Sequence, residues 1–368
     1  MNGNVRIWMG AVLALAACAA WGGEDAQAPQ QADLVKLLND PPGTGLLVLF
    51  VAPDGQAAEH RMAVGDVLTH YAGKAVGALE DLQALAAEQR GEVEVGYLRE
   101  GQARTVKVKA GKLGVNLVPV KKGQATELRP PATEVTFDFS KLEGAPRDSW
   151  YDFQIGGKKV GFEHNRLTTA GGRLMLRSTV AFDGGEQWGV NHFEVLAVAT
   201  ARPRPQILET HFTFVPTKVS TAGQRIGEPG QEPFKWHASF KGEKGPTSLT
   251  SEAPANTMAD YLITPLASFM PREKGACWHY TVLSEAEGAA LLPAGLFAAE
   301  LEDVKVGVET RSCMRYEVHS MGRVTRSIWV DEKGQIVKND YLGAQSVLVS
   351  KEAALQGLPE SLKGLKGE

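Results

Sequence analysis

The hydrophobic pattern changes along the chain, and the change predicts two folded regions of different kinds. Residues 45–51 (GLLVLFV) form an unbroken apolar run, which is typical of a strand buried on both faces. Residues 78–89 (ALEDLQALAAEQ) have the spacing of an amphipathic helix, with Leu82 and Leu85 on its apolar stripe. From Trp150 onward, long segments alternate between apolar and polar residues, which predicts strands with one buried face.

The second region is predicted to consist of many strands and few helices. Strands are expected at 150–155, 160–168, 173–182, 190–201, 206–215, 234–240, 277–283, 300–308, 313–321, 327–330 and 336–341. Alternation within 134–139 predicts one further strand between the regions. Helices are expected at 258–269, after the capping residues Asn256 and Thr257, and near 351–355.

Composition agrees with this mainly β fold and excludes one class of partner. The 368 residues are 43% hydrophobic and include 40 Gly and 19 Pro, as expected for globular cores joined by many turns. The net charge is −4 and no long cluster of Lys and Arg occurs, which argues against nucleic-acid binding.

The N-terminus predicts export. Residues 7–17 are apolar but too short to span a bilayer, as in the hydrophobic part of a signal peptide. They end in Leu15-Ala16-Ala17-Cys18, which resembles the bacterial lipobox and implies lipidation of Cys18. Cleavage after Ala19 or Ala20 is the alternative. We expect a signal peptide at 1–18 and a tether at 19–31. The chain would be anchored at the periplasmic face of the outer membrane, or soluble in the periplasm if cleaved.

The remaining cysteines predict a disulfide. Cys277 and Cys313 both lie in strand-like segments, and an exported protein meets an oxidising compartment. A disulfide between them is therefore expected. A buried pair of thiols is the alternative.

The order of elements in 45–76 resembles the PDZ module of bacterial envelope proteases. An apolar strand is followed by a short Ala-rich helix, then by Gly65-Asp66 before a strand that ends at Gly73-Lys74. A hairpin turning at residues 99–101 (REG) follows, and Gly114-Val115 resembles the start of the family's usual last strand. The resemblance covers about 32–118 and implies a small β-barrel domain that binds peptides and carries out no chemistry.

The resemblance also implies a peptide groove. The receiving strand would be formed by Leu34, Val35, Lys36, Leu37 and Leu38, and the facing helix would present Leu82 and Leu85. In the family, a short apolar-Gly-apolar loop upstream holds the carboxylate of the peptide. Residues 28–36 contain no glycine, so that loop is expected to be shortened or absent. Peptide binding and a purely structural or assembly role both stay open.

No catalytic or metal-binding pattern occurs. The chain lacks a Gly-Asn-Ser-Gly-Gly loop, a G-x-S-x-G elbow, an H-E-x-x-H helix, a C-x-x-C pair and a phosphate-binding loop. The eight His residues are scattered singly, and Asp331 begins an ordinary D-E-K-G turn. We expect no catalytic residues, metal or cofactor.

The two hairpins that begin and end the second region, at 150–162 and 327–338, resemble uncharacterised envelope proteins related to the lipoprotein-carrier fold. That fold implies a large antiparallel sheet around one covering helix or an apolar ligand. Within 258–269, the apolar residues that would plug the sheet are Tyr261, Leu262, Leu266 and Phe269. A lipid-like ligand is the other possible occupant.

These expectations combine into one description. A PDZ-like domain at 32–118 is joined by a linker at 119–148 to an antiparallel β domain at 149–356, with a tail at 357–368. The expected function is that of a non-catalytic adaptor or scaffold of the cell envelope, which binds the C-terminus or an internal strand of a protein partner. The first alternative is lipid or lipoprotein carriage by the β domain. The second is an envelope enzyme of unrecognised type.

Overall fold

The computed structural model describes residues 34–51, 55–139, 147–183, 188–198, 206–215, 219–230, 233–242, 245–284, 290–320 and 322–362. The expected signal peptide, Cys18 and the tether at 19–31 lie outside these residues. The chain divides between Arg129 and Pro130 into two compact units, which we call the N-terminal and the C-terminal unit. Each unit is described separately.

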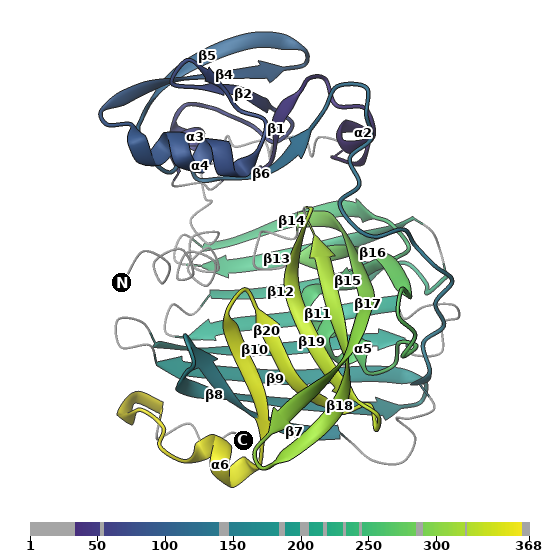
Figure 1. The fold of residues 1–368 in the computed structure, drawn as a ribbon. Coiled ribbons are helices and arrows are strands. Elements are labelled where there is room, and N and C mark those ends of the chain that lie inside the picture. The colour runs from purple at the N-terminus through teal and green to yellow at the C-terminus, as the bar shows by residue number, and fades with distance from the viewer. Residues whose placement is uncertain are drawn as a thin grey trace. The chain divides into compact units, whose positions relative to one another are not determined.

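The N-terminal unit is a six-stranded antiparallel sheet with three helices (Figure 1). Its strands lie in the order β5-β4-β2-β1-β6, and β3 pairs with the end of β2. In chain order the elements are α2 (Leu34–Asn39), β1 (Gly45–Val51), α3 (Gln56–Glu59), β2 (Val67–Tyr71), β3 (Lys74–Ala75), α4 (Leu79–Glu88), β4 (Glu92–Arg99), β5 (Gln102–Lys109) and β6 (Val115–Val120).

The two sequence features that predicted this unit have clear physical roles. Four consecutive residues of β1, from Leu46 to Leu49, are at most 5% exposed, which confirms that this strand is buried on both faces. The turn before β2 is held by Asp66. Its Oδ2 accepts the N–H of Ala63 at 2.8 Å and pairs with Nη2 of Arg99 at 2.7 Å. The buried carboxylate therefore ties the turn to the end of β4.

The segment expected to be the peptide-receiving strand is a helix, so that prediction is wrong. Residues 34–39 form α2, and the N–H of Asp40 donates to the carbonyl of Lys36 at 2.9 Å. The sequence LVKLLN places leucines three and four residues apart, which is helical spacing. Pro41 and Pro42, which follow shortly after Asn39, prevent the helix from continuing. A helix has no unpaired strand edge to offer a peptide.

The C-terminal unit is a single sheet of 15 strands that curves into a nearly closed, barrel-like form. Its order is β14-β13-β12-β11-β10-β9-β8-β7-β21-β20-β19-β18-β17-β16-β15. The sheet closes on itself far enough that β15, at one edge, lies against β11. Its strands are β7 (Arg147–Ile155), β8 (Lys158–Ala170), β9 (Arg173–Asp183), β10 (Trp188–Val198), β11 (Gln206–Val215), β12 (Val219–Ile226), β13 (Phe234–Gly242), β14 (Gly245–Ala253), β15 (Thr257–Ala259), β16 (Cys277–Ser284), β17 (Ala290–Val306), β18 (Glu309–Ser320), β19 (Arg323–Asp331), β20 (Ile336–Tyr341) and β21 (Ala344–Val349).

Helix α5 (Asp260–Ala267) lies against β10, β16 and β19 of this curved sheet (Figure 1). Every residue from Leu262 to Ala267 is buried, and the ring of Tyr261 stacks on Phe193 with centroids 3.4 Å apart. The buried guanidinium of Arg326 anchors the helix, because it donates to Asp260 Oδ2 at 2.9 Å and to Thr264 Oγ1 at 2.8 Å. The helix therefore packs its apolar side chains against the sheet.

The mainly β prediction is confirmed, although its detail is uneven. The strand expected at 206–215 and the helix at 351–355, which is α6 (Lys351–Leu355), agree with the structure, and the short 3-10 helix η4 (Glu360–Leu362) follows. The sequence did not predict β12, β14, β15, β21 or the first half of β17. Thr257, expected to cap the helix at 258–269, begins β15 instead, and the helix begins at Asp260 with Ala259 as its N-cap. Residues 134–139 form no strand, but Val135 and Phe137 are buried, and Phe137 packs edge-on against Trp278.

The expected disulfide is not present. Cys277 and Cys313 are fully buried thiols on β16 and β18, with β17 between them. Strands two positions apart in a sheet are separated by about 10 Å, whereas the Cα atoms of a disulfide lie within about 7 Å. The pairing register adds a further offset, because Cys277 lies opposite Phe297 and Cys313 opposite Glu302.

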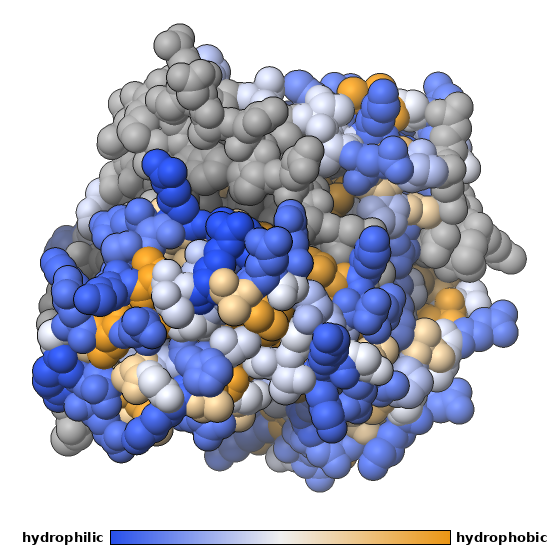
Figure 2. Space-filling view, turned by 90° about the horizontal axis from the view of Figure 1, so that it is seen from above, coloured by the Kyte–Doolittle hydropathy of each residue, from blue (hydrophilic) through white to orange (hydrophobic). Residues whose placement is uncertain are grey.

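The surface is predominantly polar where it can be seen. On the face shown in Figure 2, hydrophilic side chains predominate among the coloured residues, and hydrophobic ones form small separate groups. Scattered apolar residues of this kind are normal for a folded protein.

Candidate functional site

The strongest candidate site in the N-terminal unit is the edge of its sheet at β6. In the described part of the chain, β6 pairs only with β1, so its other edge carries no strand. Helix α4 lies beside β6, and Figure 1 shows the two elements close together. An edge strand next to a helix is the arrangement that accepts an extended peptide as an additional strand.

The backbone groups of β6 that point to this open edge follow from the printed hydrogen bonds of β1. Both backbone groups of Val48 point to the β2 side. Its N–H donates to the carbonyl of Asp66 at 2.8 Å, and its carbonyl accepts the N–H of Gly65 at 2.9 Å. Its partner on β6, Leu117, therefore turns its own N–H and C=O away from β1. Because strand residues alternate, Val115 and Leu117 present their peptide groups to the open edge.

The side chains beside this edge are apolar. In the loop before β6, Leu113 is buried. In β6 itself, Val115 and Leu117 are half-buried against the core. From α4, the side chains of Leu79, Leu82 and Ala86 are half-buried against the same core. A ligand strand added between the two elements would therefore meet apolar side chains.

A loop at the start of β6 is held in one orientation from the α3 side. Gln56, the first residue of α3, accepts the N–H of Lys109 at 2.7 Å and donates to the carbonyl of Lys112 at 3.0 Å. The N–H of Ala57 donates to the carbonyl of Leu113 at 2.9 Å. Two successive carbonyls of this loop therefore point towards α3.

The peptide planes then fix where the amides of the loop point. In a trans peptide the C=O of one residue and the N–H of the next point in opposite directions. The N–H groups of Leu113 and Gly114 thus point away from α3, and neither donates a hydrogen bond to a described residue. Gly114 has φ +76°, a left-handed conformation that glycine adopts without strain.

This loop has the chemistry of an anion site. Adjacent backbone N–H groups that point to one side form a concave nest for an anion such as a carboxylate. The side chain of Lys112, within the same loop, is exposed and adds a positive charge. The loop lies at the first residue of the open edge, where the C-terminal carboxylate of an antiparallel added strand would lie.

The structure places the residues expected to form the groove in two different settings. Lys36 is exposed, Leu37 half-buried and Leu38 buried in α2, where the carbonyl of Leu38 accepts the N–H of Thr126 at 2.8 Å. The backbones of Leu34 and Val35 also belong to α2. Leu82 and Leu85 do lie on α4, but Leu85 is a core residue, 8% exposed.

The sequence contains an apolar-Gly-apolar triplet at a place where none was sought. Leu113-Gly114-Val115 has this pattern, and its last residue begins β6. The pattern was sought only at residues 28–36, of which 28–33 lie outside the described part of the chain.

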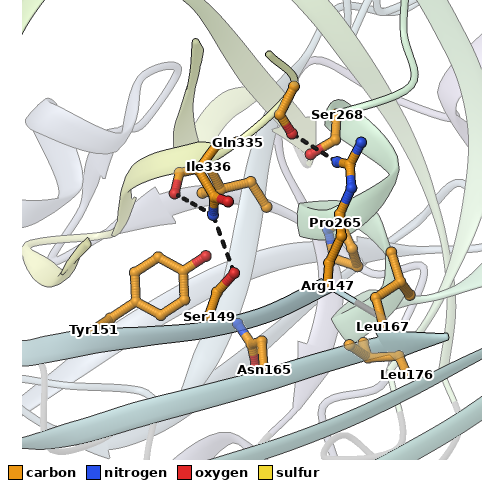
Figure 3. Close-up of a pocket in the computed structure, with 11 residues that line it drawn as sticks. Arg147, Ser149, Tyr151, Asn165, Leu167, Leu176, Pro265, Ser268, Gln335 and Ile336 are labelled. Atoms are coloured by element: carbon orange, nitrogen blue, oxygen red, sulfur yellow. Dashed lines mark hydrogen bonds between the residues drawn. The ribbon is translucent and has the colours of Figure 1, made fainter. Parts of the chain in front are cut away.

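The C-terminal unit contains a cavity of about 30 Å³ between β7, β8, β9 and the C-terminal end of α5 (Figure 3). Its polar lining includes Arg147, which donates to the carbonyl of Gly334 at 2.7 Å, and Gln335, which donates to Ser149 Oγ at 3.0 Å. Burial lowers the pKa of Arg147 and raises that of Tyr151. The volume accommodates about two water molecules, and an acyl chain would not fit.

Three further observations on the described residues bear on metal binding and on reactive side chains. Within them, no group of three or more His, Cys, Asp or Glu side chains is placed to hold a metal ion. Asp331 stabilises the turn that it begins, since its Oδ1 accepts the N–H groups of Lys333 and Gln335 at 3.0 and 2.9 Å. The buried thiol of Cys313 has its pKa raised to about 11 by burial, which disfavours the reactive thiolate.

Two further results bear on classification. No helix among the described residues is long and apolar enough to cross a membrane. Comparison of the chain with protein-family models and with curated proteins finds no match in either case.

Proposed function

We propose that the N-terminal unit binds the C-terminal end of a protein partner, which adds as an antiparallel strand to the open edge of β6. The carboxylate would be held by the N–H groups of Leu113 and Gly114, with Lys112 supplying charge. Alternate ligand side chains would meet the apolar side chains of α4. The chain would thus be a non-catalytic adaptor of PDZ kind.

One observation carries this proposal: among the described residues, the loop before β6 points two adjacent amides away from α3 at the start of a strand edge on which no other strand pairs. Two adjacent N–H groups that point to one side can together hold a carboxylate. The resemblance of residues 45–76 to PDZ modules supports the same conclusion.

The setting proposed for this adaptor is the cell envelope, as the leader and Cys18 predict. Lipid carriage by the C-terminal unit is less well supported, because α5 packs buried side chains against the curved sheet and the cavity beside it has a volume of only about 30 Å³. We assign the C-terminal unit the role of a structural body that carries the peptide-binding module.

The test is a substitution that removes one hydrogen-bond donor from the open edge. Leu117→Pro deletes an N–H that points away from β1, so the β1–β6 ladder loses no bond. The matched control is Leu117→Ala, which removes the side chain but keeps the N–H. Binding of a C-terminal octapeptide array to the whole protein would first identify ligands, and fluorescence anisotropy would then compare the variants.

We expect Leu117→Pro to weaken binding about fivefold more than Leu117→Ala does, as the loss of one hydrogen bond predicts, while circular dichroism shows that both variants are folded. If no array peptide binds up to millimolar concentration, the proposed function is wrong. Equal loss in the two variants would show that the ligand does not add as a strand to β6.

A further inference from the structure

We propose that Pro119 is a specificity-determining residue of the β6 site, because it removes the hydrogen bond that would hold the fifth ligand residue counted from the C-terminus. The inference rests on the proposed function. It concerns the length of chain that the site can recognise and the residue that determines it.

The orientation of Pro119 follows from its pairing. Pro119 lies opposite Leu46 of β1 and, like Leu117, belongs to the set of alternate residues whose peptide groups face the open edge. A proline has no N–H, and this is the side of an edge strand on which the ladder to β1 does not need one. The sheet therefore tolerates Pro119, but the open edge lacks a donor at this point.

The donors that remain define the reach of the site. Beginning at the loop, the outward N–H groups are those of Leu113, Gly114, Val115 and Leu117. The next outward position is Pro119, which offers only its carbonyl. In an antiparallel pair, each residue of one strand lies directly opposite one residue of the other. In a ligand whose carboxylate lies at Gly114, the last residue would therefore lie opposite Val115 and the third from the end opposite Leu117.

Ligand residues further upstream gain little from the backbone of β6. The fifth residue from the ligand's end would face Pro119, where its own carbonyl finds no N–H. Past Val120 the strand ends, because residues 121–124 form a turn closed by an isolated bridge between Lys121 and Gln124. Pro119 thus acts as a specificity-determining residue that makes the site recognise a chain end in preference to an internal extended segment.

The experiment compares ligand length with the donor restored. The best binders from the octapeptide array are synthesised as peptides of four, six and eight residues with the same free C-terminus. Their affinities for the whole protein are measured by fluorescence anisotropy with the natural residue, with Pro119→Ala and with Pro119→Val. Pro42→Ala, a substitution of a half-buried proline outside every strand of the same unit, is the matched control.

For the natural residue, we expect the affinity to stay within about twofold between four and eight residues. With Pro119→Ala or Pro119→Val, the octapeptide should bind about fivefold more tightly, as one added hydrogen bond predicts, and the tetrapeptide should not change. Pro42→Ala should leave all three lengths unaffected.

Two results would overturn the inference while leaving strand addition intact. One is a steady rise in affinity with length in the natural protein, and the other is an unchanged octapeptide affinity in both Pro119 variants. Complete absence of peptide binding would instead remove the proposed function on which the inference depends.

Discussion

Substitution of Gln56 is the most informative single change, because this half-buried side chain holds the proposed carboxylate loop from both ends. Its amide accepts from the N–H of Lys109 at 2.7 Å and donates to the carbonyl of Lys112 at 3.0 Å. Gln56→Ala removes both bonds and leaves the α3 backbone, including the Ala57 N–H bond to Leu113, able to form as before.

The expected cost can be worked out from these two bonds. Each contributes about 0.5–1.5 kcal/mol net, and partial exposure places them at the lower end, so the N-terminal unit should lose about 1–2 kcal/mol of unfolding free energy. A loop that must be ordered during binding should cost about another 1 kcal/mol, which is a fivefold weaker peptide affinity.

The assay must report on the N-terminal unit alone. Residues 34–129 contain no tryptophan, and five of the seven tryptophans lie after residue 129, so tryptophan fluorescence would mainly follow the C-terminal unit. Hydrogen exchange of β2 and β4 amides, measured at several urea concentrations, gives the unfolding free energy of the N-terminal sheet. Gln102→Ala is the control, because Gln102 is exposed and makes no side-chain hydrogen bond to the described residues. If Gln56→Ala is no more destabilising than Gln102→Ala, the loop is not held as we describe.

Three further predictions concern the C-terminal unit. Arg326→Met should destabilise the C-terminal unit by about 3 kcal/mol, because the Asp260 carboxylate loses its buried partner. Urea unfolding followed by tryptophan fluorescence measures the loss of stability. Adding Asp260→Asn to this variant should restore part of it. Cys277 and Cys313 should resist alkylation until the protein unfolds, and a reductant should leave the melting temperature unchanged; mass spectrometry that finds them linked would contradict the structure. Burial alone would raise the pKa of Glu302, but hydrogen bonds from Trp329 and Arg315 outweigh it and lower that pKa below its ordinary 4.5. A carboxyl group whose pKa is lower in the folded state stabilises the fold above the unfolded value, and this contribution is lost as the pH falls. Glu302→Gln should therefore lose less stability than the natural protein between about pH 5 and about pH 3, and equal losses would show that Glu302 contributes nothing.

Local patterns in the sequence predicted those elements whose structure is decided locally. The hairpin of β4 and β5 turns at residues 99–101, as the sequence predicted, because strand alternation and the turn Arg99-Glu100-Gly101 specify it within a few residues. The segment 34–38 was assigned as a strand on resemblance alone, although its leucine spacing was helical. There the local pattern was the better guide.

The features that escaped prediction depend on contacts between distant residues. The strands β12 and β14 contain many Ser, Thr and Gly residues, so their own sequence carries little β signal, and pairing with β11 and β13 determines them. The cysteines could not be judged from spacing, since β17 separates their strands. The candidate carboxylate loop required knowledge of which strand lies at the edge of the sheet.

The central claim is that a ligand's C-terminus adds to β6 through the loop at Leu113 and Gly114. Hydrogen–deuterium exchange of individual amides tests it most directly, after addition of an array peptide with either a free or an amidated C-terminus at the same concentration. We predict that the free-carboxylate peptide slows exchange at Leu113, Gly114, Val115 and Leu117, and that the amidated peptide leaves all four fast. Protection that appears elsewhere, or that is the same for both peptides, would contradict the account.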